Sequence, residues 1–305
     1  MSTLSSKNLG NILITGGAGF IGSNLIKSII NNYKFKKIIS IDNYSTGTRN
    51  NHYKHKRVVY INLDTRNILN HKSKILKQFK PKYVFHFAEF SRIVPSFEHI
   101  KDCWSFNMMG TFNVLQYVIK KKAKLIYSGS SSALGNKNNE HLSPYSWSKS
   151  KNKELIKNFS KWYNLNYTTV LFFNVYGHKQ IKNHYMAAVI GIFEDQYFKN
   201  KPLTVVKPGN QKRDFTHVND ITNGTILAAI RGHKKEYELS SGKSYKIIDV
   251  AKMFGRKIKY LNARPGERFS GASNHKLAKK DLGYSPKYHL KEYIKNFISK
   301  SKNNN

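Results

Sequence analysis

The chain has 305 residues, of which 39% are hydrophobic and 13% aromatic. This is enough for one large domain, or for a larger and a smaller domain sharing a cleft, and it excludes wholesale disorder. A single cysteine, Cys103, excludes an intrachain disulfide framework and a multi-cysteine metal site. Residues 1–10 lack an apolar segment of signal-peptide length, and no uncharged apolar run reaches about 18 residues. We therefore expect a cytoplasmic protein without membrane spans.

The chain is strongly basic, because 53 Lys and Arg residues against 17 Asp and Glu residues give a net charge of +36. Such an excess often indicates a nucleic acid or another anionic partner. Here 44 of the basic residues are lysines spread along the whole chain, together with 32 asparagines, which is what an AT-rich coding sequence would enrich. We therefore expect no specific nucleic-acid partner, although the positive field would attract phosphorylated substrates.

Patterns typical of strands and helices alternate from the beginning of the chain. Strands are predicted at Asn11–Thr15, Lys37–Asp42, Arg57–Asn62, Lys82–Ala88 and Lys124–Ser128, and helices at Ser23–Asn31, Ile68–Phe79 and Ser105–Lys120. This alternation predicts an α/β fold with a Rossmann-type, doubly wound parallel sheet. We expect an NAD-binding domain over residues 1–173. Residues 174–305 are expected to form mainly a smaller substrate-binding lobe, with some segments returning to the main sheet and a frayed tail from residue 299.

A glycine-rich segment follows the first predicted strand. Gly17, Gly19 and Gly22 have the spacing of a dinucleotide-binding fingerprint, directly after a strand and at the start of a helix. Glycines there let the backbone turn sharply and approach a pyrophosphate at the positive end of the helix. Asp42 closes the second strand, where its carboxylate would bind an adenosine ribose and repel a 2′-phosphate. The pattern predicts NAD rather than NADP as the cofactor.

Tyr145 and Lys149 lie four residues apart, after a serine and a proline that suit the start of a helix. Ser143 fits an N-cap and Pro144 a first helical residue, so the tyrosine and the lysine would share one helix face. An ammonium beside a phenol favours the phenolate, which can act as the general base for a sugar or alcohol hydroxyl. On a lysine-rich chain such a pair is close to chance by itself. The pair is informative because it follows the glycine loop and a serine cluster in the chain.

That serine cluster, Ser128-Gly129-Ser130-Ser131-Ser132, lies at the carboxyl end of the fifth predicted strand. Ligands and chemistry in open α/β sheets concentrate at those ends. A hydroxyl there would orient the reacting hydroxyl and share its proton with Tyr145. The alternative is a polar loop without a catalytic role, and the pattern alone leaves open which of the three later serines takes part.

Together these motifs resemble the extended short-chain dehydrogenase/reductase superfamily and, within it, the NAD-dependent nucleotide-sugar epimerase/dehydratase family, which includes the UDP-hexose 4-epimerases. The resemblance extends over nearly the whole chain. Its segments are residues 15–23, Asp42-Asn43, His86-Phe87-Ala88, Asn107 with Gly110-Thr111, the serine cluster, Tyr145 with Lys149, and residues 173–177, 213–218 and 264–267. The resemblance implies oxidation of a nucleotide sugar at C4 by NAD, and a homodimer formed through the helix that carries Tyr145.

The resemblance also implies roles for single residues. Those implied to contact NAD are Gly16, Gly19, Phe20, Ile21, Asp42, Asn43, Asp64, Phe87, Ala88, Asn107 and Lys149. Those implied to hold the nucleoside diphosphate are Asn174, Arg213, Arg264 and Glu267. Two arginines can clamp a diphosphate through paired hydrogen bonds. The implied catalytic set is Ser130, Tyr145 and Lys149, and no metal site is expected.

The family diverges after its 4-keto intermediate. A 4-epimerase returns the hydride to the other face of the sugar, whereas a 4,6-dehydratase eliminates water with an Asp-Glu pair directly after the catalytic hydroxyl residue. That hydroxyl aligns with Ser130, and the two acidic positions hold Ser131 and Ser132. The sequence therefore favours 4-epimerisation, with a 4,6-dehydratase or a 4-keto reductase as the alternatives. A non-catalytic polyanion-binding protein on the same fold is a more distant one.

One further position bears on the sugar. In related UDP-hexose 4-epimerases, the residue seven positions after the arginine that matches Arg264 lines the sugar pocket. A large aromatic residue there excludes N-acetylated sugars, and a small residue admits them. Here the residue is Gly271. The resemblance therefore implies UDP-GlcNAc and UDP-GalNAc as substrates, with UDP-Glc and UDP-Gal as further candidates.

Overall fold

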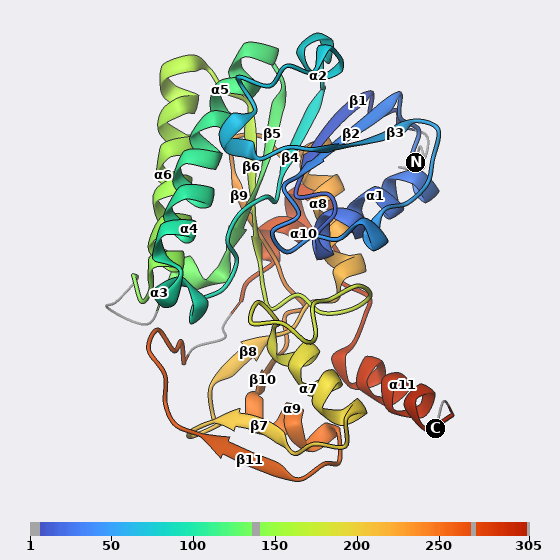
Figure 1. Cartoon of the computed structure of the whole chain (residues 1–305), viewed down its shortest axis with the longest axis vertical. Coiled ribbons are helices and arrows are strands. Elements are labelled where there is room, and N and C mark those ends of the chain that lie inside the picture. Colours follow the sequence, from blue (N-terminus) through green and yellow to red (C-terminus); the bar gives the residue numbers. More distant parts are fainter. Residues whose placement is uncertain (1–6, 136–140, 270–272, 304–305) are drawn as a thin grey trace.

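A seven-stranded parallel sheet organises the larger part of the molecule (Figure 1). The structure is a computed structural model that describes residues 7–135, 141–269 and 273–303. The strand order is β3-β2-β1-β4-β5-β6-β9. The strands are β1 (Asn11–Thr15), β2 (Lys37–Asp42), β3 (Val58–Asn62), β4 (Tyr83–His86), β5 (Lys124–Ser130), β6 (Tyr167–Phe172) and β9 (Glu236–Leu239). The expected Rossmann-type α/β fold is confirmed.

Helices cover both faces of this sheet, which explains why its central strands are continuous apolar runs. One face packs against α1 (Phe20–Asn32), α8 (Val218–Arg231) and α10 (Lys276–Leu282). The other face packs against α2 (Lys74–Gln78), α5 (Thr111–Lys121) and α6 (Pro144–Tyr163), and α4 (Ile100–Trp104) packs against α6. Both apolar layers contain fully buried residues from β1, since Ile12 and Ile14 belong to one core and Leu13 to the other.

The order of the strands reverses between β1 and β4, which are parallel neighbours with Ile12 opposite Tyr83. From β1 the chain continues outward to β2 and β3, and from β4 it continues to β5 and β6. The loops after β1 and β4 therefore diverge at the carboxyl edge and leave a crevice between them. In open α/β sheets this crevice is where ligands bind.

A smaller lobe lies beyond that carboxyl edge, in the lower half of Figure 1. It contains α7 (Val189–Phe198), β7 (Leu203–Val206), β8 (Lys212–Asp214), β10 (Ser244–Lys246), α9 (Ile247–Met253), β11 (Ile258–Leu261) and α11 (Leu290–Asn303). The strands β7 and β11 pair in parallel, while β8 and β10 pair antiparallel. An apolar core of its own, including Phe193, Phe215 and Phe254, holds this lobe together.

The chain passes between the two parts more than once. After β8 it returns to the main sheet through α8 and β9, then enters the smaller lobe again at β10, and α10 lies once more against the main body. As a result, β8 and the segment around residues 264–268, which are far apart in sequence, lie on the lobe side of the crevice. The isolated bridge between Tyr176 and His217 joins the two crossings.

Three local predictions differ from the structure. The expected helix Ile68–Phe79 is only α2, because Ser73 accepts a hydrogen bond from the Leu76 backbone and so begins the helix there. The expected helix Ser105–Lys120 begins as a π-helical turn over Ser105–Gly110 before α5. The expected frayed tail is wrong, since α11 continues to Asn303 with its apolar face, including Ile294, in the core of the smaller lobe.

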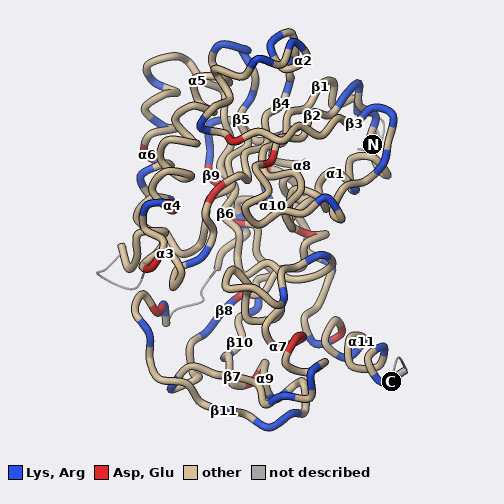
Figure 2. Tube along the Cα trace, viewed as in Figure 1, with Lys and Arg blue, Asp and Glu red and all other residues tan. Residues whose placement is uncertain are grey.

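The described surface is basic on both parts of the molecule. Figure 2 shows Lys and Arg distributed over the main body and over the smaller lobe, with few Asp and Glu between them. This agrees with the even spread of lysine along the sequence. Over the described residues, no helix has the length and apolar character needed to cross a membrane.

Candidate active site

The glycine loop lies between β1 and α1, beside the crevice. Gly16 has a φ of +73°, and a Cβ atom there would approach the Ala88 backbone nitrogen to 2.8 Å. A Cβ atom at Gly22 would come within 2.2 Å of the Gly16 carbonyl oxygen. Only glycine therefore allows this tight approach of the loop to β4 and to the first turn of the helix. Gly19 is the N-cap of α1, and Phe20 and Ile21 are its first helical residues, whose N–H groups have no partner within the helix.

Asp42 lies at the carboxyl end of β2 with its carboxylate turned toward the glycine loop. It accepts hydrogen bonds from the backbone nitrogens of Ala18, at 2.9 Å, and Tyr44, at 2.8 Å. Burial raises the pKa of Asp42, and these two backbone donors oppose the increase. The carboxylate is thereby fixed at the place where the spacing from the glycines predicted an acid.

Asn43 and Asp64 are joined at the same edge of the sheet. The Asn43 side-chain amide donates to Asp64 at 2.8 Å, and the Arg66 guanidinium donates to both carboxylate oxygens of Asp64 at 2.8 Å. Burial alone would raise the pKa of Asp64, but these hydrogen bonds together hold it below its usual range. The structure therefore brings Asp42, Asn43 and Asp64 together beyond β2 and β3.

His86, Phe87 and Ala88 continue from β4 into the crevice, and Thr15 anchors them. The Thr15 hydroxyl contacts the His86 ring at 2.7 Å and accepts from the backbone nitrogens of Phe87 and Ala88 at 3.1 Å. The other ring nitrogen of His86 lies 3.0 Å from the Thr111 hydroxyl. Complete burial lowers the pKa of His86 to about 4, so the ring is neutral near pH 7 and serves as a structural link.

Ser130 is the last residue of β5 and caps the short 3-10 turn Ser131–Leu134. Its hydroxyl oxygen lies 2.8 Å from that of Ser132 and accepts from the Ser132 backbone nitrogen at 3.2 Å. The structure places Ser130 at the carboxyl edge, next to the start of α6, which packs against β5 and this turn. Ser131 and Ser132 are both buried within the turn.

Tyr145 and Lys149 lie on the first two turns of α6, whose N-cap is Ser143 and whose first residue is Pro144, as the sequence predicted. The Ser143 hydroxyl accepts from the Ser146 backbone nitrogen at 3.1 Å, which fixes where the helix begins. Tyr145 is buried at the head of the helix, and its phenol has no hydrogen-bond partner among the residues that the structure describes.

The Lys149 side chain reaches back across the end of β5. Its ammonium donates to the Ser128 carbonyl oxygen at 2.6 Å and forms a buried ion pair with Glu89. Glu89 directly follows Ala88, three residues beyond the end of β4. The sequence analysis missed this carboxylate, although an acid directly after a buried strand at the carboxyl edge was a usable signal.

Asn107 occupies the π-helical turn before α5 and is completely buried. Its side-chain oxygen accepts from the Phe90 backbone nitrogen at 2.7 Å, and its amide donates to the Ser148 hydroxyl at 2.9 Å. These bonds tie the segment after β4 to α6. Asn107 therefore positions the loop that carries Phe87, Ala88 and Glu89.

On the lobe side of the crevice, Arg213, Arg264 and Glu267 come together. Glu267 accepts from the Arg213 guanidinium at 2.6 Å and from the Arg264 Nε at 3.3 Å. Burial lowers the pKa of Arg213, and the neighbouring Glu267 opposes this. The structure thus joins two motifs that are about 50 residues apart in sequence. Asn174, with a φ of +31°, donates from its amide to the Asp214 carbonyl oxygen at 2.9 Å and so lies beside the same strand.

Arg268 is a second residue that the sequence analysis missed. Its side chain is buried and donates to the carbonyl oxygens of Gly135, at 2.9 Å, and Ser131, at 2.6 Å. Burial, together with the nearby Arg213, lowers the pKa of Arg268 to about 10, which leaves it charged near pH 7. Arg268 therefore ties the lobe segment to the turn that contains the serine cluster. Gly271 lies outside the described residues.

Comparison with known proteins shows the family of this chain. The model of the NAD dependent epimerase/dehydratase family matches residues 12–240, from the first residues of β1 to just beyond the end of β9.

The chain belongs to the NAD-dependent epimerase/dehydratase family.

Similar proteins from this family span its full length. One relative is a Methanocaldococcus jannaschii protein to which UDP-glucose 4-epimerase activity is assigned by inference. It is 31% identical to this chain, and the match covers 96% of this chain and 99% of that protein. The structure of a Thermotoga maritima UDP-glucose 4-epimerase with UDP-glucose has a TM-score of 0.87 at 25% identity, covering 96% and 99% of the two chains. A Methanobrevibacter ruminantium UDP-N-acetylglucosamine 4-epimerase in complex with UDP-N-acetylmuramic acid has a TM-score of 0.83 at 27% identity, covering 95% and 98%.

As a family member, this epimerase/dehydratase uses NAD, and the shape of the glycine loop fits that cofactor. The contacts that a Cβ atom would make at Gly16 and Gly22 show a backbone cradle that larger residues would fill. The cradle opens at the N-terminus of α1, where free N–H groups and the helix dipole favour a pyrophosphate. Asp42 lies at the end of the adjacent strand, as binding of the adenosine ribose requires.

Proposed function

We propose that this enzyme is a UDP-sugar 4-epimerase that acts through a 4-keto intermediate. The observation that carries the proposal is the serine turn: Ser130 supplies a hydroxyl beside the head of α6, while the two following positions are the buried hydroxyls Ser131 and Ser132. Elimination of water from the sugar needs a proton donor and a proton acceptor there. Hydroxyls bonded within a turn do not provide that pair, whereas epimerisation needs only the base, the hydroxyl and the cofactor.

In this proposal, Tyr145 as the phenolate removes the proton from the sugar C4 hydroxyl. Ser130 orients that hydroxyl, and the Lys149 ammonium stabilises the phenolate through its positive charge. NAD, when bound, would supply the hydride acceptor for C4 and the hydride donor for either face of the 4-keto sugar. Tyr145 then gives the proton back to the C4 oxygen, which completes inversion at that carbon.

The cofactor would be held by the residues that line the crevice on the side of the main sheet. The proposed contacts are Gly16, Gly19, Phe20, Ile21, Asp42, Asn43, Asp64, Phe87, Ala88, Asn107 and Lys149. The position of Asp42 supports NAD over NADP, because a 2′-phosphate would lie against a carboxylate.

The substrate's diphosphate would be held by Arg213 and Arg264, with Asn174 beside them. Charge-assisted hydrogen bonds from guanidinium groups are the strongest recognition that a side chain offers to phosphate. Glu267 already pairs with both arginines. Its carboxylate would orient them and accept hydrogen bonds from the ribose hydroxyls of the nucleotide.

For the sugar itself, we propose UDP-GlcNAc and UDP-GalNAc. This rests on Gly271 in the sequence, because the resemblance to UDP-hexose 4-epimerases implies that a glycine at this position leaves room for an N-acetyl group. The similarity to an N-acetylglucosamine 4-epimerase supports the proposal. UDP-Glc and UDP-Gal, which lack that group, would also fit.

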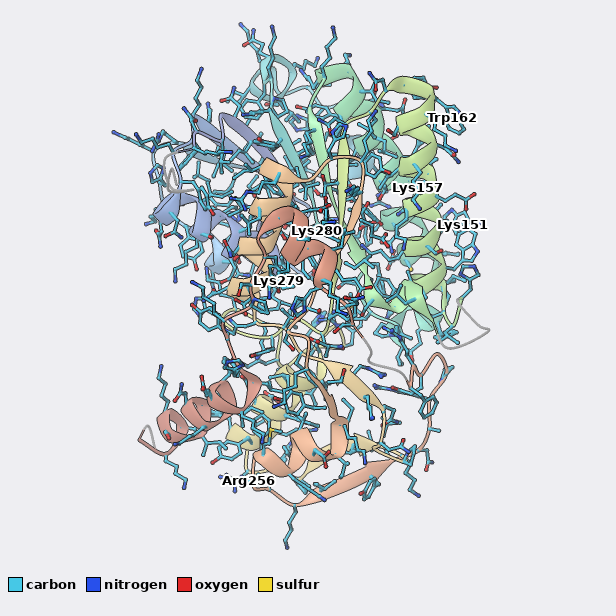
Figure 3. The ribbon with its side chains drawn as sticks, turned by 180° about the vertical axis from the view of Figure 1, so that it is seen from behind. Lys151, Lys157, Trp162, Arg256, Lys279 and Lys280 are labelled. Atoms are coloured by element: carbon cyan, nitrogen blue, oxygen red, sulfur yellow. The ribbon has the colours of Figure 1, made fainter. Side chains whose placement is uncertain are left out.

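We further propose that the enzyme is a cytoplasmic homodimer. Large apolar side chains are exposed along α4, α5 and α6, with Trp104 stacked on Trp147 at 5.3 Å and Trp162 62% exposed. Figure 3 shows Trp162 on α6 on the outer side of the molecule, with Lys151 and Lys157 further along the helix. Large apolar side chains exposed on neighbouring helices are typical of an interface between subunits. The single cysteine, which is free and buried, agrees with a reducing compartment.

The test of the proposed function is proton NMR of the purified enzyme with NAD and UDP-GlcNAc, followed at the anomeric signals. Growth of UDP-GalNAc signals to a stable mixture is the expected result. Signals of a 4-keto-6-deoxy sugar would instead assign dehydration, and UDP-Glc as a second substrate tests the breadth of the sugar site. No change with any of these UDP-sugars would contradict the proposed activity.

The sugar assignment has its own test in Gly271→Tyr. A large aromatic side chain at this position would occupy the space of the acetyl group, so we expect kcat/KM for UDP-GlcNAc to fall while that for UDP-Glc is retained. Equal losses for both substrates would overturn the assignment. The matched control is Tyr260→Phe, a conservative change at an exposed residue of β11.

A further inference from the structure

Glu89 is the centre of a buried polar network that the reaction described above does not require. Its side chain is 1% exposed, and its carboxylate forms the ion pair with Lys149. It also accepts hydrogen bonds from the Thr111 hydroxyl at 2.9 Å, the Tyr127 hydroxyl at 3.0 Å and the Asn152 amide at 3.0 Å. These four donors come from α5, β5 and α6, so the carboxylate joins three elements that surround the end of β4.

The Lys149 ammonium is largely committed to this network. It has three hydrogens to donate, and in the structure it donates to Glu89 and to the Ser128 carbonyl oxygen. Its side chain is only 4% exposed. A buried ammonium without a carboxylate would be costly, because desolvation disfavours the charged form. The charge that the proposed reaction needs on Lys149 therefore depends on Glu89.

The other titratable groups near this pair are neutral around pH 7. His86 on β4 has its pKa lowered to about 4 by burial, and burial raises the pKa of Cys103 on α4 to about 11. Burial also holds the pKa of Tyr127 on β5 well above its usual value. Arg92, before α3 (Pro95–Glu98), donates to the Met186 carbonyl oxygen; burial lowers its pKa, and its electrostatic interaction with Tyr145 opposes this.

We propose that Glu89 is a positioning residue of the catalytic centre, which holds the Lys149 ammonium at the end of β5 and offsets part of its field at Tyr145. The inference rests on the proposed function and deepens it. Glu89 does not touch the reacting atoms. It sets the pH range in which Tyr145 and Lys149 work together.

The consequence of removing the carboxylate follows from electrostatics. In Glu89→Gln, the Lys149 ammonium has no counter-charge. While it is protonated, it therefore favours the Tyr145 phenolate more strongly than in the wild-type enzyme. The acid limb of the pH profile consequently moves to lower pH. The same unpaired, buried ammonium loses its proton more readily, so the alkaline limb also moves to lower pH. Both limbs therefore shift in the same direction.

The experiment measures kcat/KM against pH for the wild-type enzyme, Glu89→Gln, Glu89→Asp and Tyr127→Phe, with saturating NAD and the UDP-sugar that the wild-type enzyme converts. We expect a downward shift of both limbs by about one pH unit in Glu89→Gln. Glu89→Asp keeps the charge and should restore the wild-type limbs. Tyr127→Phe removes one donor to Glu89 but leaves both charges, so its limbs should also stay in place.

Two outcomes overturn the proposal in that experiment. One is a Glu89→Gln enzyme that is slower at every pH with limbs unmoved, since this indicates a purely structural carboxylate. The other is a Tyr127→Phe enzyme that shifts as far as Glu89→Gln, since the charge would then not be the cause.

A second measurement tests the pair without any turnover, so it separates this inference from the substrate assignment. Urea unfolding is compared for Glu89→Gln, Lys149→Met and the double variant. Each single change leaves one buried charge unpaired, whereas the double change removes both. We expect the double variant to unfold at a higher urea concentration than the sum of the single effects predicts, or to fold where a single variant does not. Strictly additive losses would overturn the proposal.

Discussion

The two sides of the crevice hold their polar groups in different ways. On the side of the main sheet, the carboxylate of Asp42 is bonded to backbone nitrogens, and Lys149 is bonded to a backbone carbonyl and a buried carboxylate. On the lobe side, Arg213, Arg264 and Glu267 are bonded to one another, and Arg264 is 48% exposed. The first side is held through bonds to the backbone and a buried carboxylate, whereas the second is held by ion pairs between side chains, for which the proposed diphosphate would compete.

The two sides of the crevice therefore differ in how firmly their polar groups are held before a ligand binds. Backbone-anchored groups hold their geometry before any ligand arrives, which suits atoms that must meet a reacting bond. On the lobe side, Arg213 and Glu267 are largely buried, whereas Arg264 is about half exposed, and partly exposed ion pairs such as Arg264–Glu267 contribute little stability and exchange partners readily. We therefore expect changes on the sheet side to affect rate and cofactor binding, and changes on the lobe side to affect mainly substrate affinity.

The largest effect is expected for Tyr145→Phe. Loss of the phenol removes the proposed base, so kcat should fall by about 10²–10⁴-fold, the range of general acid–base catalysis. Binding of NAD and UDP should remain, because neither rests on that hydroxyl. Steady-state kinetics and calorimetric titration with UDP check both points. Turnover close to that of the wild-type enzyme would remove Tyr145 from its role.

Asp42→Ala tests the side of the main sheet, where polar side chains are bonded to the backbone. Losing a hydrogen bond to a charged group costs about 1.5–3 kcal/mol, so the affinity for NAD should fall by about 10–100-fold. The preference for NAD over NADP should also narrow, because the charge that repels a 2′-phosphate is gone. Titration with both dinucleotides measures this. A general loss of structure would weaken both equally and leave the preference unchanged.

The stability of both parts should fall in acid because of two buried histidines. Burial lowers the pKa of His86 and of His217, at the head of α8, to about 4 in each case. Below the unfolded pKa of about 6.5, the unfolded chain binds protons that the folded chain does not, so stability declines as the pH falls toward 4. Each histidine should contribute a loss of about 2 kcal/mol between pH 6.5 and pH 5.

Urea unfolding of the wild-type protein and of His217→Gln, at pH 7 and at pH 5, measures this loss of stability. The variant should lose less stability between the two pH values than the wild-type protein does. An identical pH dependence in the two proteins would show that His217 takes up no extra proton on unfolding.

The smallest of these effects is expected on the lobe side of the crevice, for Arg213→Ala. One of two arginines remains, so KM for the UDP-sugar should rise by about tenfold, corresponding to about 1.4 kcal/mol, with kcat and NAD affinity little changed. The matched control is Arg256→Ala, an arginine that bonds to Asn200 and that Figure 3 shows at the end of the smaller lobe away from the main sheet. A large fall in kcat for Arg213→Ala would contradict this expectation, because Arg213 would then affect the rate as the residues on the side of the main sheet do.

The sequence predicted most successfully where local pattern and tertiary packing agree. The bounds of β1 and β2 match the expected strands, because short apolar runs before turn residues have one good place in a parallel sheet. The start of α6 at Ser143 and Pro144 also followed from local capping chemistry. The predicted helix over Ile68–Phe79 was wrong about where the helix begins, because the spacing of apolar residues does not show which residue acts as the N-cap.

The residues that were missed have partners far away along the chain. Glu89 bonds to Lys149, 60 residues later, and Arg268 bonds to the backbone of Ser131, 137 positions earlier. A charged side chain becomes buried only because the fold brings its partners to it, and no local pattern records that. The resemblance to a family identified Arg264 and Glu267, yet it gave no indication of the arginine directly after them.

The tryptophans described on α4 and α6 have an optical consequence. The chain has three tryptophans, Trp104, Trp147 and Trp162, and all lie on these two helices. The tryptophan fluorescence of the protein therefore originates from the two helices proposed to join two subunits. Emission that shifts to longer wavelength on dilution would report, without any label, the exposure of these indole rings to water as the subunits separate.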